Sequence, residues 1–454
     1  MRRLALLAVV ALLIAWGLRQ PTPAGPTVGE ILPMAAGFIG SWIRCNTVGC
    51  PAELIEGMDE VVFASGELLP AVPVAVDADE WGRLYVAEGG RISGGVEDNR
   101  FRSEAWYRDD LAARSVDDRR AYIERALARG EFEDPDAFTK IADRLIRLDD
   151  TDGDGVADRS HEVARFADVV DGPAAGVLAH EGDVYVTEIP SVYRFRDVDG
   201  DADGLPEQKE VLTTGYGVKT SLMGHDLHGL AWGPDGRIYF SMGDRGYHVT
   251  TDDGRVLTPS MGPGRGAVFR MWPDGRELEV FATGVRNPQE LAFDDEGHLF
   301  TVDNNGDGGD EARLVYLVEG GETGWAMPYQ TLIGDYVRGP WVAEGLWETH
   351  HEGQPAWALP PVAYLATGPS GLAAYPGLGL PERYRDHFFV ADYRYMKGAS
   401  GVISFAAEPS GASFELVDEH MFAGSLLATD VDFGMDGTLV VSIFDQIGQS
   451  QEIV

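Results

Sequence analysis

The strongest constraint on the fold is a phrase that recurs six times along the chain. Each copy has a β-rich run, a tight turn with Gly or Asp, and a second β-rich run that ends near a polar residue. Two such runs across a short turn predict a β-hairpin. The copies are VPVAVDADEWGRLYVAEG, AAGVLAHEGDVYVTE, HGLAWGPDGRIYFSMGD, NPQELAFDDEGHLFTVDN, PSGLAAYPGLGLPERYRDHFFVADY and ATDVDFGMDGTLVVSIFD.

A second hairpin follows most copies, as in GAVFRMWPDGRELEVFATG, so the repeating unit has four strands. Four-stranded units of roughly fifty residues are typical of propeller blades. We therefore expect an all-β fold, a six-bladed β-propeller over residues 71–454. Only IGQSQEIV follows the last copy, so we expect DEVVFASGELLP, in an N-terminal segment 26–70, to supply the missing outer strand. This strand would close the ring and remove exposed sheet edges.

The first blade is expected to carry a small helical insertion over about residues 104–148, after its second strand. Ser115 before VDDRRAYIERALARG, with Asp118 in the first turn and Gly130 at the end, predicts one helix. Pro135 predicts the start of a second helix. The insertion is expected to form either a lid or wall of a pocket, or a support packed on the rim.

The N-terminal residues 1–25 predict a signal peptide or a membrane anchor. Arg2 and Arg3 precede an apolar run, the layout of a secretory signal, and the run is short for a membrane span. Ala15-Trp16-Gly17 offers a cleavage site, whereas Arg19 and PTPAGP also fit an uncleaved anchor. Both alternatives place the protein in the periplasm or outside the cell, in the second case anchored to the membrane.

Two cysteines, Cys45 and Cys50, lie close together in IRCNTVGC. In an oxidising compartment such a pair predicts a local disulfide, and a pair of buried thiols is the alternative.

The net charge of -38 argues against nucleic acid and anionic membranes as partners, because both require basic patches. Part of the acidity lies in two loops of alternating carboxylates, which suit a calcium ion. Both loops are expected in the second hairpin turns of their blades, where the calcium would be structural. Their candidate ligands are Asp150, Asp152, Asp154 and Asp158 in the first loop, and Asp197, Asp199, Asp201, Asp203 and Glu207 in the second.

Strand counting places most of the unusual polar residues on one face. In a four-stranded blade, the loop entering strand one and the loop leaving strand two open on the same face, and loops on rigid scaffolds often carry function. For any single Asp or Asn, ending a strand is the alternative. The residues expected around the central opening are His225, His228, Asp244, Arg245, Arg286, Asn287, Gln289, Asp303, Asn304, Asn305, Asp310, Glu311, Asp392 and Arg394.

At GHDLHGLAWGPDGRIYFSMGDRG and TGVRNPQELAFDDEGHLFTVDNNGDGGDEARLVYLVEGGETGWAMPY the sequence resembles the soluble glucose and sorbosone dehydrogenases that use pyrroloquinoline quinone (PQQ). It is most similar to the branch known as membrane-bound dehydrogenase domains, often from planctomycetes. The likeness covers about residues 70–450.

This resemblance implies roles for individual residues. His225 falls on the catalytic base and Asp244 on the acid that orients it. Carbonyl groups near Asn305 and Gly306 fall where the family binds the calcium that also touches the quinone. The implied cofactor-binding residues are Arg286, Asn287, Asn304, Asp310 and Arg394, the last at a family Lys.

The resemblance implies a PQQ- and calcium-dependent dehydrogenase that oxidises a sugar or polyol hydroxyl by hydride transfer. Electrons would pass to a separate acceptor, such as a c-type cytochrome or a quinone. One departure is that Thr429 and Asp430 in SLLATDVDFG stand where glucose dehydrogenases have paired arginines. The alternatives are a calcium-dependent lactonase-like hydrolase and a non-catalytic propeller that binds carbohydrate or another partner.

Overall fold

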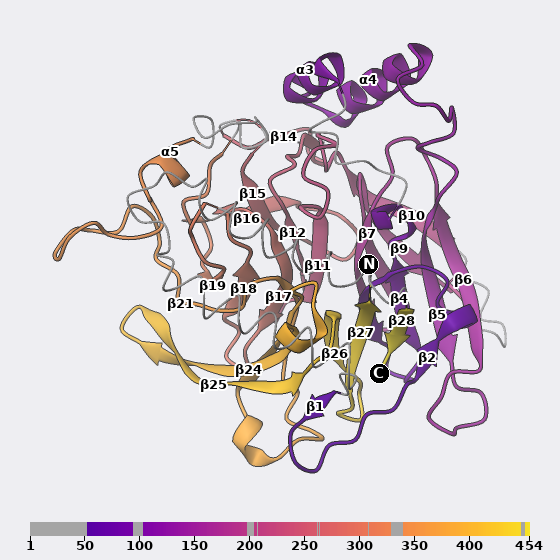
Figure 1. Cartoon of the computed structure of the whole chain (residues 1–454), viewed down its shortest axis with the longest axis vertical. Coiled ribbons are helices and arrows are strands. Elements are labelled where there is room, and N and C mark those ends of the chain that lie inside the picture. Colours follow the sequence, from indigo (N-terminus) through magenta and orange to yellow (C-terminus); the bar gives the residue numbers. More distant parts are fainter. Residues whose placement is uncertain are drawn as a thin grey trace, which may run out of the picture.

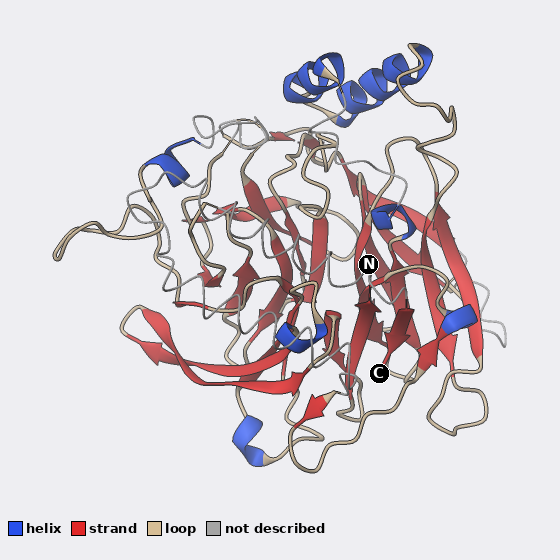
Figure 2. Cartoon of the chain, in the orientation of Figure 1, coloured by secondary structure: helices blue, strands red, loops and turns tan. Residues whose placement is uncertain are grey.

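The computed structural model describes residues 52–93, 103–197, 204–206, 208–260, 262, 264–306, 308–327, 339–445 and 450–454. The expected signal or anchor, Cys45, Cys50 and the loop residues Asp199, Asp201, Asp203 and Glu207 lie outside these ranges. Strands make up most of the described secondary structure (Figure 2). Within the same ranges, no helix has both the length and the apolar character needed to cross a bilayer.

Six sheets of four or five strands stand in a ring, so the chain is a six-bladed β-propeller (Figure 1). Blades 1 and 2 contain β3 (Pro73–Ala78), β4 (Leu84–Glu88), β5 (Asp143–Asp149) and β6 (Arg159–Phe166), then β7 (Ala174–His180), β8 (Asp183–Glu188), β9 (Ser191–Arg196) and β10 (Gln208–Thr214). Blade 3 contains β11 (Leu227–Trp232), β12 (Ile238–Met242), β15 (Gly266–Met271), β16 (Glu279–Val285) and β20 (Gly321–Glu322). Blade 4 contains β17 (Pro288–Phe293), β18 (Leu299–Asp303), β19 (Arg313–Leu317) and β21 (Ala363–Tyr364).

Blade 5 contains β22 (Pro369–Ala374), β23 (His387–Asp392), β24 (Gly401–Ser410), β25 (Ser413–Gly424) and, on its outer edge, β1 (Glu53–Leu54). Blade 6 contains β26 (Ala428–Phe433), β27 (Leu439–Asp445), β28 (Ser450–Ile453) and β2 (Ala64–Ser65). A separate pair, β13 (Val249–Thr250) and β14 (Val256–Leu257), follows β12, and a short helix α5 spans Gly339–Ala343. Neighbouring strands pair antiparallel, except that β16 pairs with β20 in parallel.

The blades pack against one another through their apolar faces. The first strands β3, β7, β11, β17, β22 and β26 contact one another in turn and form the inner ring. A separate cluster of buried apolar side chains fills each junction between neighbouring blades. Successive side chains of a strand point to opposite faces of its sheet, so each blade buries one face against each of its two neighbours.

The ring closes where the sequence predicts it. Ala64 and Ser65 of β2 pair antiparallel with Ile453 and Glu452 of β28, as the outer strand of blade 6. The same segment joins the first blade, because the Phe63 carbonyl accepts a hydrogen bond of 2.7 Å from the Ala157 amide. The N-terminal segment therefore connects blades 6 and 1.

The helical insertion leaves blade 1 after β4, as expected, and its helices α3 (Glu104–Ala112) and α4 (Val116–Ala128) lie side by side (Figure 1). The Ser115 side chain caps α4 by accepting from the Asp118 amide at 3.2 Å, and Gly130 ends it with a φ of +68°.

Two expectations about the insertion are wrong. Pro135 starts no helix, because residues 134–140 form turns in which Asp134 accepts from the Asp136 amide at 2.9 Å. Few residues separate Pro135 from the next strand, and a helix that short is not stable by itself. The insertion also ends before residue 148, because β5 already begins at Asp143.

We call the face with the loops that enter first strands and leave second strands the loop face, and the face with the hairpin turns the turn face.

Candidate active site

The centre of the candidate site is a hydrogen-bonded chain of three side chains on the loop face. His225 precedes β11, and its Nδ1 lies 2.7 Å from Oδ1 of Asp244, which follows β12. The other oxygen of Asp244 accepts from the Trp325 indole N–H at 2.8 Å. Because a carboxylate only accepts, Nδ1 of His225 is the donor in this contact, so that in the neutral tautomer the lone pair lies on Nε2. The side chain of Asp244 is fully buried, whereas that of His225 is 12% exposed, so the imidazole can take up a proton from a bound molecule.

The loop that presents His225 is held by a buried ion pair. Arg245 donates from Nη1 to Asp226 Oδ1 and from Nε to the carbonyl of Lys219 at 2.9 Å. Asp226 also accepts from the Gly224 amide at 2.8 Å. Removing either partner of a buried pair is costly, so this contact fixes the loop on both sides of His225.

His228 belongs to the buried contacts that hold the His225 loop, and it is not part of the chain of His225, Asp244 and Trp325. It is 3% exposed, and its Nε2 accepts from the Asp226 amide at 2.8 Å. Burial lowers the pKa of His228 to about 4, so the ring is neutral near pH 7.

The insertion contacts the same loop through Asp110 of α3. Asp110 is buried and accepts from the Thr220 amide at 2.8 Å and from the Ser221 hydroxyl at 2.5 Å. Tyr122 of α4 donates to the same carboxylate at 2.7 Å. The insertion was expected to form either a lid or wall of a pocket, or a support on the rim. These contacts correspond to the support.

A second group of predicted residues surrounds Asp303. The backbone amides of Arg286 and Asn287 donate to its Oδ1 at 3.0 Å and 2.7 Å, and Arg313 donates to its Oδ2 at 2.5 Å. The Arg286 guanidinium lies over the Trp325 ring, 5.4 Å from its centroid. The Arg286 carbonyl accepts from the Asp244 amide at 2.9 Å, so this group adjoins the His225 chain.

The loop after β18 brings Asn304, Asn305, Gly306 and Asp310 together. The Asn304 side chain accepts from the Asn305 amide at 2.8 Å, and Asp310 accepts from the Gly306 amide at 2.7 Å. A Cβ on Gly306 would lie 2.8 Å from the Trp325 ring, so only glycine fits there. Glu311, in contrast, is exposed.

Asp392 and Arg394 form a separate pair on the loop after β23. Asp392 accepts from the Gly368 amide at 2.7 Å and from Nε of Arg394 at 2.5 Å. The Arg394 side chain is 36% exposed. Gln289 donates to the carbonyl of Gly224 at 3.0 Å and so contacts the His225 loop.

Thr429 and Asp430 connect blades rather than offering cationic groups. Thr429 donates to the Pro73 carbonyl at 2.7 Å, and Asp430 accepts from the Val76 amide at 2.8 Å. Both contacts join blade 6 to the inner strand of blade 1.

Sequence reasoning missed Trp325, Asp110 and Lys219. Lys219 is 3% exposed, and burial lowers its pKa while Asp110 and Asp244 act to raise it. A lysine inside the apolar stretch GYGVKTSLMG is the one local signal for such a residue.

On the turn face, Asp150, Asp152 and Asp154 each place a carboxylate oxygen within 4.8 Å of the others. Asp158 is not part of this cluster, and it accepts from the Thr151 hydroxyl at 2.5 Å. Asp197 of the second acidic loop follows β9.

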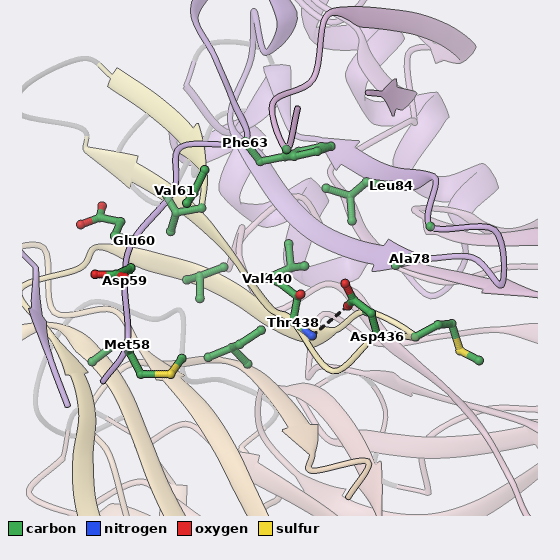
Figure 3. A pocket seen from close by; sticks show the side chains of 18 of the residues that line it. Met58, Asp59, Glu60, Val61, Phe63, Ala78, Leu84, Asp436, Thr438 and Val440 are labelled. Atoms are coloured by element: carbon green, nitrogen blue, oxygen red, sulfur yellow. Dashed lines mark hydrogen bonds between the residues drawn. The ribbon is translucent and has the colours of Figure 1, made fainter. Parts of the chain in front are cut away.

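An apolar cavity of about 660 Å³ lies away from the His225 loop. The segment Met58–Phe63 and the turns after β3 and β26 line it (Figure 3). Asp436 in its wall accepts from the Thr438 amide at 2.9 Å and so serves its own turn. We place the candidate site at His225, because titratable side chains converge there.

Comparison with known proteins gives the family. Residues 53–415 match a family model described as Domain of unknown function (DUF7133). The chain belongs to the DUF7133 family. No curated protein matches this DUF7133 chain.

Solved structures resemble this DUF7133 protein at low identity. One is a putative oxidoreductase (glucose dehydrogenase) from Thermus thermophilus, with 17% identity, 89% of this chain and 99% of that chain covered, and a TM-score of 0.50. Another belongs to Carbohydrate-Active Enzymes Family AA12 of Trichoderma reesei, with 11% identity, 89% and 97% covered, and a TM-score of 0.51. A third is the PQQ-bound form of an aldose sugar dehydrogenase from Streptomyces coelicolor, with 18% identity, 89% and 96% covered, and a TM-score of 0.48. At such identities the first two show a shared fold, which by itself does not give function.

Proposed function

We propose that this DUF7133 chain is a quinone-dependent dehydrogenase that oxidises a sugar hydroxyl, of the branch known as membrane-bound dehydrogenase domains. The observation that carries the proposal is the imidazole of His225, held through Nδ1 by the buried carboxylate of Asp244. The fold shared with a putative glucose dehydrogenase supports the same interpretation.

The acid–base chemistry follows from the three-residue chain. Nε2 of His225 accepts the hydroxyl proton of the substrate as its hydride leaves. The Asp244 carboxylate stabilises the resulting imidazolium, and the Trp325 N–H keeps that carboxylate in place. A positioned general base contributes roughly 100- to 10,000-fold to a rate.

The neighbouring loops fit a PQQ-like quinone, which carries carboxylates and needs cationic and N–H donors. Arg286, Asn287, Asn304 and Arg394 would hold it, and Asp310 would order the loop beside it. Carbonyl groups of Asn305 and Gly306 would bind the calcium ion. Thr429 and Asp430 supply no cationic group to this site, because both serve contacts between blades. When bound, the quinone would supply the hydride acceptor.

The test uses the full chain loaded with calcium and PQQ, a panel of sugars and a redox dye. His225→Asn should keep quinone binding and lower the rate by roughly 100-fold or more, because the proton acceptor is lost. His248→Asn, at an exposed histidine, is the control and should be unchanged. Asp244→Asn should act in the same direction more weakly, and Arg286→Ala should chiefly weaken quinone binding.

Full activity of His225→Asn would reject this residue as the base. A parent protein that binds no quinone would reject the dehydrogenase, and lactone hydrolysis that needs calcium alone would favour the lactonase-like alternative.

The remaining proposals concern the setting of the enzyme. We propose that it acts in the periplasm or outside the cell, with a Cys45–Cys50 disulfide, and passes electrons to a separate acceptor. We also propose a structural calcium ion at Asp150, Asp152 and Asp154, which the gathered carboxylates support.

A further inference from the structure

An acid recurs at one position of the blades. In blades 1, 2, 4 and 5 the residue opposite the start of the inner strand is a Glu or Asp, and each of these acids is fully buried. The pairs are Pro73 with Glu88, Ala174 with Glu188, Pro288 with Asp303 and Pro369 with Asp392. The surroundings of the four acids can therefore be compared position by position.

Three of the four acids are neutralised in the same way. Each accepts backbone amides from the loop entering its blade and pairs with one arginine. The amide donors are Ala71 for Glu88, Arg286 and Asn287 for Asp303, and Thr367 and Gly368 for Asp392. The arginines are Arg144, Arg313 and Arg394 in the same order.

Glu188 lacks both kinds of partner. Neither of its carboxylate oxygens has a hydrogen-bond partner among the described residues. The residue before Ala174 is Pro173, which has no N–H, and the amide of Gly172 donates instead to the Ile189 carbonyl at 2.9 Å. On the third strand Glu188 faces Ser191, where Glu88 faces Arg144.

A second acid lies against the same segment. Asp143 is fully buried and accepts from the Arg91 amide at 2.7 Å through Oδ1, while its Oδ2 has no hydrogen-bond partner within the described ranges. A Cβ on Gly172 would lie 2.5 Å from that Oδ2, so Asp143 and Glu188 flank the stretch from Gly172 to Ala174.

The nearby guanidinium of Arg91 bonds to neither acid. It donates to four backbone carbonyl groups, those of Phe138, Ile141, Asp168 and Asp171. Burial raises the pKa of Glu188 well above its usual range, and the charge of Asp143 adds to this effect. Arg91 and Lys209 act in the opposite direction on the pKa of Glu188, and Asp143 keeps one amide donor. Within the described ranges, however, three buried carboxylate oxygens have no hydrogen-bond donor, which is unfavourable.

We propose that Glu188 and Asp143 bind a hard divalent cation of the Ca²⁺ class, buried between blades 1 and 2. Carboxylate oxygens are the donors that such a cation prefers, and the three oxygens without partners are available to it. The cation neutralises the buried acid of blade 2, as an arginine does in blades 1, 4 and 5. It is distinct from the proposed ion at Asp150, because Asp143 and Asp149 stand at opposite ends of β5.

The test measures bound calcium and thermal unfolding of the full chain after chelation and after calcium is returned. Glu188→Gln keeps the shape of the side chain and removes its charge, so it should lose about one calcium ion per chain and much of the gain in Tm on calcium addition. Without calcium its Tm should be at least that of the parent, because the amide carries no charge that must be either buried or neutralised by a proton on folding. Asp143→Asn should lose the same ion.

Asp152→Ala is the matched control for the turn-face loop. It should leave the ion at Glu188 in place, so the double variant Asp152→Ala, Glu188→Gln should bind less calcium than Asp152→Ala alone. If Glu188→Gln and Asp143→Asn both bind as much calcium as the parent and gain as much Tm from it, Glu188 is a neutral buried acid and the proposal is wrong.

Discussion

At the scale of the residue, the candidate site depends on how one carboxylate divides its two oxygens. One oxygen of Asp244 bonds to His225 and the other accepts from Trp325. The indole therefore orients the carboxylate that in turn orients the imidazole. Such an arrangement lets a buried carboxylate stay hydrogen-bonded while it fixes an imidazole.

Trp325→Phe tests this arrangement by removing one N–H from Asp244. A hydrogen bond to a charged group contributes about 1.5–3 kcal/mol, so we expect turnover to fall roughly tenfold or more with little change in quinone binding. Trp341→Phe is the comparison variant, because its indole donates at 3.1 Å to Asp310 in the proposed quinone loop, so this change should weaken quinone binding rather than turnover. Equal losses in the two variants would show that Trp325 acts by packing alone.

His228 should make stability depend on pH. Its folded pKa of about 4 lies below the unfolded value near 6.5, so the unfolded state takes up a proton first as the pH falls. The free energy of unfolding should therefore drop between pH 6.5 and 4, by about 2 kcal/mol at pH 5. His228→Gln should lack this component, as measured by the difference between denaturant titrations of the two proteins at about pH 7 and pH 5. Parallel pH profiles would contradict the assignment.

At the scale of the element, the helical insertion acts as a support for the loop that carries His225. Trp106, Tyr122 and Phe138 build its own small core with Val218 of that loop. Asp110 adds the polar contacts.

Asp110→Ala should lower the free energy of unfolding by about 2–4 kcal/mol, because it removes the buried carboxylate that accepts from the amide of Thr220 and from the hydroxyl of Ser221. Asp109→Ala is the control one position earlier, where a partly exposed carboxylate lies 3.3 Å from Arg125. This change should cost less than about 1 kcal/mol. Urea titrations measure both values, and a small loss for Asp110→Ala would show that the apolar contacts suffice.

The blades could be predicted from the sequence because their signal is local. Alternating side chains and a turn with Gly or Asp lie within a few residues of each other, and the same pattern recurs in every blade. The wrong prediction of a helix at Pro135 also came from a local signal. Such a signal marks where a helix can start, but it does not show that the next strand begins only a few residues later.

The site could be predicted only in part. His225 and Asp244 came from the likeness to a known family, and strand counting placed their loops on one face. The contacts of Trp325 with Asp244 and of Asp110 with Thr220 join distant positions, and no local pattern marks them. The missing partners of Glu188 follow from Pro173, which becomes informative only when the blades are compared in register.

At the scale of the whole molecule, the ring is held at one junction by a segment from the start of the described chain. Leu69 is fully buried there with Val76 of blade 1 and Ile453 of blade 6.

Leu69→Ala should therefore lower the free energy of unfolding by about 2–5 kcal/mol, the usual cost of a cavity in a core. Val61→Ala, at a side chain that is 56% exposed, is the control and should cost less than about 1 kcal/mol. Calorimetry or denaturant unfolding decides, and similar small losses in both would mean that this junction is not part of the cooperative fold.

Because Ala64 pairs with Ile453, the ring can close only after the last strand has been synthesised. A ribosome adds roughly 5–20 residues per second, so on the order of 20–80 seconds pass between the appearance of β2 and that of β28. Five blades can form on the nascent chain in that time, but the ring stays open. During this interval the edge strands of the first and last blades are free to pair with other chains, and the protein is then most prone to aggregate.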